Sequence, residues 1–194
     1  MKKTLSMSAW VATGILLTGL NATAANFITS MTYSGHTYEL WANQDITWAD
    51  AKANAESGGG YLAALTDAAE TSAVYSSFIG NDFFTSNDGQ EHQAWLGGYT
   101  TDANFTTTNP LAWAWTTGES WTAFDVSNFA GGEPNGDSTG LSINRFGTPL
   151  WNDEGGRVGG YIVEKNSVPD SGSTLSLMFG VGSVIVLVGR KYRK

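Results

Sequence analysis

Two short groups of oxygen-bearing side chains are the residues of this sequence best suited to chemistry. The segments Glu133-Pro134-Asn135 and Trp151-Asn152-Asp153 each place a carboxylate and a carboxamide within three positions. Ca²⁺ binds about six to eight oxygen atoms from carboxylates, carboxamides, carbonyls and water. Brought together by the fold, the two segments would form a calcium cage, although either tripeptide alone is more often a solvated turn.

Catalytic chemistry finds little support. His36 falls in an expected strand and His92 in a polar loop, the chain has no cysteine, and no serine lies in a nucleophile motif. Carboxylates are numerous enough to form a hydrolytic pair, but nothing in their spacing singles one out. We therefore expect a binding protein without catalytic residues rather than an enzyme.

The first half of the chain predicts two helices alternating with two strands. Alternating side chains indicate a half-buried strand, and Thr47-x-x-Asp50 is a helix-capping arrangement. The expected elements are a strand over 33–41, a helix from Thr47 to Gly58, a strand over 61–65 and a helix from Thr66 or Asp67 to Gly80. A helical period is absent from the second half, which predicts short strands over 94–98, 141–145 and 160–164. Between the first two lies a Trp-rich loop over 104–137, and loops of this length are usually functional.

Composition limits the partners. Residues 26–166 contain 17 acidic and 4 basic side chains, a local charge of −13, so we expect no nucleic-acid partner. Without cysteine, stability must come from packing, with a metal ion as a further contribution. The length of this segment fits one domain.

The first 25 residues are typical of a secretory signal peptide. Lys2 and Lys3 precede an apolar run that ends in small residues, and cleavage is expected after Ala24 or Ala25. Export places the domain at the cell envelope surface or in the extracellular matrix.

The C-terminal segment 167–194 has three parts: the motif Val168 to Gly172, an apolar stretch over 174–189 and a basic tail. It resembles the bacterial sorting signals that exosortase-type transpeptidases read, in the variant with the sequence Val-Pro-Asp-Ser-Gly. The resemblance implies at least transient membrane contact, cleavage near the motif and transfer to the envelope or matrix. The alternative is an uncleaved membrane anchor with the basic tail in the cytoplasm.

The order of motifs across the domain is more specific than either oxygen-bearing group. The chain reads Ala94-Trp95-Leu96-Gly97-Gly98, then Trp113-x-Trp115-x-x-Gly118-Glu119-x-Trp121, Gly132-Glu133-Pro134-Asn135, Trp151-Asn152-Asp153 and Gly160-Tyr161-Ile162-Val163-Glu164. From about Tyr33 to Lys165 this resembles the C-type lectin-like domain. The resemblance implies an α+β fold with two helices, two small antiparallel sheets and a long calcium-binding loop region, in which Pro134 follows a cis peptide bond.

The same resemblance implies a shared metal and carbohydrate site. Glu133, Asn135, Asn152 and Asp153 would bind both Ca²⁺ and a sugar, and the Glu-Pro-Asn form goes with mannose-, glucose- or fucose-type hydroxyls. A further acidic ligand of the family is here either Asp137 or missing, and the family's paired cysteines are absent. The expected partner is therefore a glycan or exopolysaccharide. The alternative is a structural or adhesive surface protein that binds no sugar.

Overall fold

The computed structural model describes residues 24–102, 108–136 and 138–166. Most of the expected signal peptide, the whole segment 167–194 and Asp137 lie outside the described residues. Within the described ranges, no helix is long and apolar enough to cross a membrane.

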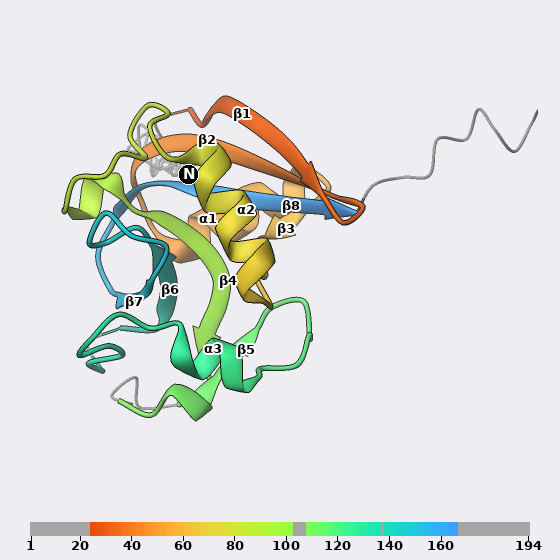
Figure 1. Ribbon diagram of the computed structural model, residues 1–194. Coiled ribbons are helices and arrows are strands. Elements are labelled where there is room, and N and C mark those ends of the chain that lie inside the picture. The colour runs from red at the N-terminus through yellow and green to blue at the C-terminus, as the bar shows by residue number, and fades with distance from the viewer. Residues whose placement is uncertain (1–23, 103–107, 137, 167–194) are drawn as a thin grey trace, which may run out of the picture.

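Helices cover both faces of one mixed sheet (Figure 1). Its strands are β1 (Asn26–Tyr33), β2 (His36–Ile46), β3 (Tyr61–Leu62), β4 (Ala94–Thr100), β5 (Trp113–Trp115), β6 (Gly140–Ile143), β7 (Trp151–Glu154) and β8 (Val158–Asn166). The order is β1-β2-β8-β4-β6-β7, with β3 beside β8 and β5 beside β4. Only the β4–β8 pair is parallel among the pairings of these strands. The helices are α1 (Trp48–Ser57), α2 (Ala68–Phe78) and α3 (Ala123–Ser127), with 3-10 turns η1 (Gln90–His92) and η2 (Pro110–Ala112).

The two long helices begin where their capping residues predict. The Thr47 side chain accepts a hydrogen bond from the backbone N–H of Asp50, and Asp67 accepts from those of Ala69 and Glu70. Glu70 reaches one residue further back than a capping box requires and accepts from the backbone N–H of Thr66 at 2.6 Å. These bonds satisfy N–H groups that have no partner within the helix.

Strand β2 sends alternate side chains to two hydrophobic clusters, one on each face of the sheet. Tyr38 and Leu40 join Val74 and Phe78 of α2, whereas the partly buried Trp41 packs in the cluster of Ala51 and Ala55 of α1. In Figure 1 helix α2 accordingly crosses in front of β2 and β8, and α1 lies behind them. The side-chain period of two along a strand places α1 and α2 on opposite faces.

The α+β class and C-type lectin-like architecture are confirmed, with differences in detail. The strands connect into one sheet rather than two, because β4 pairs with β8 on one side and with β6 on the other. Strands β1, β5 and β7 and the short helix α3 were not expected. Of these, β5 and α3 lie within the 104–137 segment that was predicted to be loop.

Candidate functional site

The two oxygen-bearing segments meet at the carboxylate of Asp153. Its Oδ1 accepts a hydrogen bond from the backbone N–H of Asn135, and its Oδ2 accepts one from that of Gly136, both at 2.9 Å. These partners are 18 and 17 positions away in the sequence. The fold therefore joins the Glu133–Asn135 turn to strand β7 through one buried side chain, which is 1% exposed.

The turn itself is closed by a local hydrogen bond. The backbone N–H of Asn135 also donates to Oε2 of Glu133 at 3.1 Å. The Glu133–Pro134 peptide bond is cis, as the resemblance implied. The carboxylates of Glu133 and Asp153 thus share one backbone donor, so the two acidic groups lie close together.

Strand β7 is held in place by its register and by Trp151. Asp153 pairs with Leu141 of β6, and Trp151 pairs with Ile143. The fully buried indole of Trp151 lies perpendicular to that of Trp115, with ring centroids 5.4 Å apart. Packing of this size anchors the strand from which Asp153 extends.

Glu154, the residue after Asp153 on β7, is the centre of a buried polar network that the sequence did not predict. Glu154 Oε2 accepts from the side-chain amides of Gln93 at 2.8 Å and Asn152 at 3.4 Å. Its Oε1 accepts from the Gln90 amide at 2.8 Å and the Gly156 backbone at 2.9 Å. With four donors on one carboxylate, Glu154 orients the amide of Asn152. Gln90 and Gln93 stand three positions apart, but that spacing alone does not indicate their shared partner.

The four predicted ligand residues fit a hard cation by donor chemistry, although the structure brings only the carboxylates of Glu133 and Asp153 to one backbone donor. Two carboxylates, from Glu133 and Asp153, and two carboxamides, from Asn135 and Asn152, are oxygen ligands of the kind Ca²⁺ takes. A carboxylate oxygen has more than one lone pair, so the N–H bonds to Asp153 do not exhaust it as a ligand. Among the described residues no group of three or more His, Cys, Asp or Glu could hold a metal, so the amide oxygens would have to contribute. Asp137, the further candidate ligand, lies outside the residues that the structure describes.

Solved structures with the same arrangement of elements fix the fold. The bovine CD23 carbohydrate-recognition domain, crystallised with a GlcNAc2Man3 oligosaccharide, is 16% identical with a TM-score of 0.54, over 72% of this chain and 95% of that one. A calcium-independent type II antifreeze protein is 18% identical with a TM-score of 0.53, over 74% and 98%. This chain has the C-type lectin-like fold. No family profile matches its sequence, and no curated protein matches it either.

Proteins of this fold differ in their use of calcium, so the fold alone does not decide what this chain binds. One structural neighbour is a Ca²⁺-dependent type II antifreeze protein in its Ca²⁺-free form, 19% identical with a TM-score of 0.54, over 70% of this chain and 96% of that one. The neighbours are lectin-like binding domains rather than enzymes. What this chain binds must be argued from its own residues.

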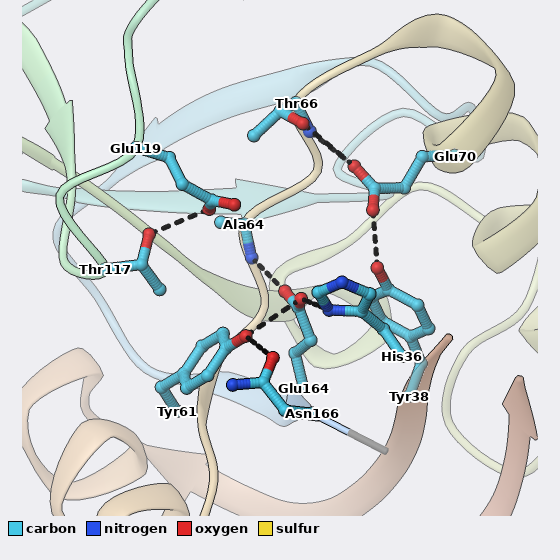
Figure 2. Close-up of polar contacts among 10 residues, drawn as sticks. All are labelled: His36, Tyr38, Tyr61, Ala64, Thr66, Glu70, Thr117, Glu119, Glu164 and Asn166. Carbon is cyan, nitrogen blue, oxygen red and sulfur yellow. Dashed lines mark hydrogen bonds and ion pairs between the residues drawn. The ribbon is translucent and has the colours of Figure 1, made fainter. Parts of the chain in front are cut away.

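A second polar cluster surrounds the buried Glu164 of β8 (Figure 2). His36 Nδ1 lies 2.6 Å from Glu164 Oε1, which also accepts from the Tyr61 hydroxyl at 3.0 Å. The backbone N–H of Ala64 donates to Oε2 at 3.0 Å. Beside this group, Tyr38 donates to Glu70. His36 lies at the start of β2, within the strand expected over 33–41.

Burial sets the ionisation of this second cluster. It raises the pKa of the Glu164 carboxyl, and the bonds from Ala64, Tyr61 and His36 only partly offset that rise. Burial also raises the pKa of Tyr61, and the neighbouring Glu164 carboxylate raises it further. The tyrosine therefore stays protonated and donates its hydrogen bond to Glu164 across the physiological range.

Proposed function

We propose that this domain binds carbohydrate in a calcium-dependent manner, with mannose-, glucose- or fucose-type hydroxyls as the recognised groups. The supporting observation is the hydrogen bonding of Asp153 to the backbone of Asn135 and Gly136. It brings the carboxylate of Asp153 against the turn that carries Glu133 and Asn135, although the two segments are distant in the sequence. The fold shared with glycan-bound C-type lectin domains agrees with this proposal.

Each side chain has a defined task in the proposal. Glu133, Asn135, Asn152 and Asp153 supply oxygen ligands, and Ca²⁺ when bound would polarise and orient two neighbouring sugar hydroxyls. Amide hydrogens of the two asparagines donate to these hydroxyls, and the carboxylates accept from them. Glu154 fixes the direction of the Asn152 amide by accepting from its nitrogen.

Calcium affinity depends on whether Asp137 is a ligand. Each additional carboxylate raises the charge of the cage and its affinity for the ion. With Asp137 as a ligand, Ca²⁺ should bind more tightly than the roughly millimolar value found in weak extracellular modules. Titration calorimetry on the parent chain and on Asp137→Asn separates the cases, because equal affinities would exclude Asp137 from the cage.

A structural or adhesive role without sugar is the second candidate, and one observation favours it. Both oxygens of Asp153 already accept backbone hydrogen bonds, and the Asn152 amide is turned to Glu154, so the loops are closed by internal bonds. A site closed in this way holds its shape without a ligand. Under this alternative, removing calcium changes neither adhesion nor the conformation of the loops.

Display at a surface completes the proposal. The predicted signal peptide exports the chain, and an exosortase-type transpeptidase would transfer it through segment 167–194 to the cell envelope or extracellular matrix. A single small site for a hydrated ligand binds weakly. Many copies on one surface raise the effective affinity by roughly 10²–10⁴-fold without a new contact, provided the glycan spans several sites.

A glycan array with the full chain in mild detergent tests the calcium-dependent function. We expect a calcium-dependent part of the binding to mannose- or fucose-type glycans, measured as the signal in millimolar Ca²⁺ that chelator removes. Glu133→Gln should remove that part, whereas Glu119→Gln, an exposed carboxylate outside the site, should leave it unchanged. A folded parent chain that binds no glycan in either buffer would favour the structural role.

A further inference from the structure

A groove lined by none of the Glu133–Asp153 site residues lies elsewhere on the domain. It has a volume of about 830 Å³ and lies between α1 and the face of β2 and β8 that α1 covers. In Figure 1 this is the far side of β2 and β8, away from α2. Pockets for small ligands usually measure about 300–1,000 Å³. The groove is therefore large enough for a ligand of several rings.

Three aromatic rings lie side by side along the sheet at this groove. The strand register places Phe27 opposite Trp41 and Trp41 opposite Tyr161. The planes of Trp41 and Tyr161 differ by 6°, with centroids 6.4 Å apart, and Phe27 meets Trp41 edge-on at 5.5 Å. Trp41 and Tyr161 line the groove. The partly exposed indole of Trp41, backed by the buried ring of Tyr161, offers a flat apolar surface on which the C–H face of a pyranose ring can stack.

Neutral polar groups surround the aromatic surface. The carboxamides of Asn43 and Gln44 on β2 and of Asn54 on α1 line the groove, together with the Ser57 hydroxyl. A carboxamide both donates and accepts hydrogen bonds, as a sugar hydroxyl does. The ring of Trp41 thus complements the apolar ring face of a saccharide, and the carboxamides complement its hydroxyl groups.

Acidic side chains outnumber basic ones along the groove, with Glu39, Asp45 and Asp50 against Arg157 and Lys165. Glu39 accepts from Lys165 Nζ and from Trp41 Nε1, both at 2.9 Å. Arg157 Nη1 donates to the backbone carbonyl of Asp45 at 2.8 Å. Two of the four basic side chains of the domain are thereby engaged, and the domain carries a charge of −13. An anionic ligand would meet repulsion with no cation reserved for it, so the groove favours a neutral one.

Export would leave the groove in place. Ala24 and Ala25 also line it, and the predicted signal-peptide cleavage after either of them removes part of its wall. The remaining lining residues belong to segments 39–58 and 157–165, which stay in the mature chain. The groove of the exported protein is thus at least as open as that of the full chain.

We propose that this groove is a second, calcium-independent binding site for a short neutral oligosaccharide, stacked on Trp41 and hydrogen-bonded by Asn43, Gln44 and Asn54. The site needs no metal, because the carboxamides of Asn43, Gln44 and Asn54 can donate to and accept from sugar hydroxyls directly. A displayed protein with two separate saccharide sites could join two glycan chains. This inference does not depend on the Glu133–Asp153 site.

The test is a glycan array of neutral and acidic oligosaccharides probed with the full chain in detergent and excess chelator. We expect binding to neutral oligosaccharides that survives chelator. Trp41→Ala should weaken it roughly tenfold or more, as removal of a central Trp does in binding sites. Phe146→Ala, which truncates an aromatic side chain that is 42% exposed and outside the groove, is the matched control and should have no effect.

Exposed rim residues keep the test decisive if Trp41→Ala does not fold. Gln44→Ala and Asn54→Ala change side chains exposed to solvent and should weaken chelator-resistant binding roughly threefold or more while the fold is kept. Absence of such binding in the folded parent chain, or binding that none of the groove variants reduces, would refute the proposal. A preference for acidic glycans would also refute it. Glu133→Gln leaves binding at the groove intact, so failure of one site is distinguishable from failure of the other.

Discussion

The carboxylate of Asp153 supports a quantitative prediction about how the candidate site is assembled. Asp153→Asn removes the negative charge and replaces one acceptor oxygen with an amide nitrogen. In the parent chain the two carboxylate oxygens accept hydrogen bonds from the backbone N–H groups of Asn135 and Gly136, at 2.9 Å each. In the variant the new amide nitrogen would face one of these N–H groups and could not accept from it. One hydrogen bond is therefore lost and the other is no longer charge-assisted.

The loss of stability in Asp153→Asn depends on how deeply the side chain is buried. A hydrogen bond to a charged group contributes about 1.5–3 kcal/mol, and leaving a buried donor without a partner costs about 1–3 kcal/mol. Since the Asp153 side chain is 1% exposed, water replaces little of the loss. We expect the free energy of unfolding to fall by about 3 kcal/mol, which lowers Tm by roughly 6–12 °C in a domain of this size.

Urea denaturation followed by tryptophan fluorescence, in chelator to exclude any metal contribution, measures this change. Asp82→Asn is the matched control, because Asp82 is exposed and its positive φ of 48° is one that Asn also adopts. The control should stay within about 0.5 kcal/mol of the parent chain. A loss below about 1 kcal/mol in Asp153→Asn would contradict the view that these hydrogen bonds join the turn to β7.

Two further predictions concern the rest of the domain. Burial raises the pKa of Glu164 above 4.5, its value in the unfolded chain. Between these two pKa values the folded state keeps a proton that the unfolded chain has released. The free energy of unfolding should therefore fall as pH rises from about 4.5 through the pKa of the folded state. Urea midpoints between pH 4 and 8 should depend less on pH in Glu164→Gln, and an unchanged slope would exclude this assignment. Gly97→Ala would place a Cβ 2.4 Å from the Leu62 carbonyl oxygen and should cost about 3 kcal/mol in thermal or urea unfolding. Gly131→Ala has open space and is its control; equal stability of the two variants would contradict the packing argument.

Local signals explain why the helices were predictable. Thr47 and Asp67 cap their helices through bonds to residues two or three positions ahead, so the sequence alone carries the information. Val74 and Phe78 lie one turn apart in the sequence and are both buried, so the inward face of α2 also follows from local spacing. Elements defined by contacts within one turn need no knowledge of the rest of the fold.

Strand β7 was not predicted because the residues that stabilise it are distant in the sequence. Its residues are mostly polar, yet all four are buried. They are kept there by pairing with β6 and by the amides of Gln90 and Gln93 on Glu154, some sixty positions away. Polar side chains normally indicate a solvated loop, and only the tertiary partners reverse that reading.

The candidate site was predictable as a set of residues but not as a geometry. The resemblance brought Glu133, Asn135, Asn152 and Asp153 into one hypothesis, and the structure places Asp153 against the turn that contains Asn135. Its use of backbone N–H groups, and the bond of Asn152 to Glu154, depend on how two loops meet. Ligand binding by these residues stays a prediction.

The pairing of β8 with β2 has a mechanical consequence for a protein tethered at its C-terminal side. The described chain ends at Asn166, opposite His36, and the ladder continues from there to the pair of Ile46 and Val158. If the predicted C-terminal sorting signal tethers the chain beyond Asn166, a ligand held at the Glu133–Asp153 site would put β8 under tension along its own axis. Hydrogen bonds of an antiparallel ladder run perpendicular to that axis, so they would be loaded in shear and would share the force. Unzipping them one at a time would require a pull from another direction.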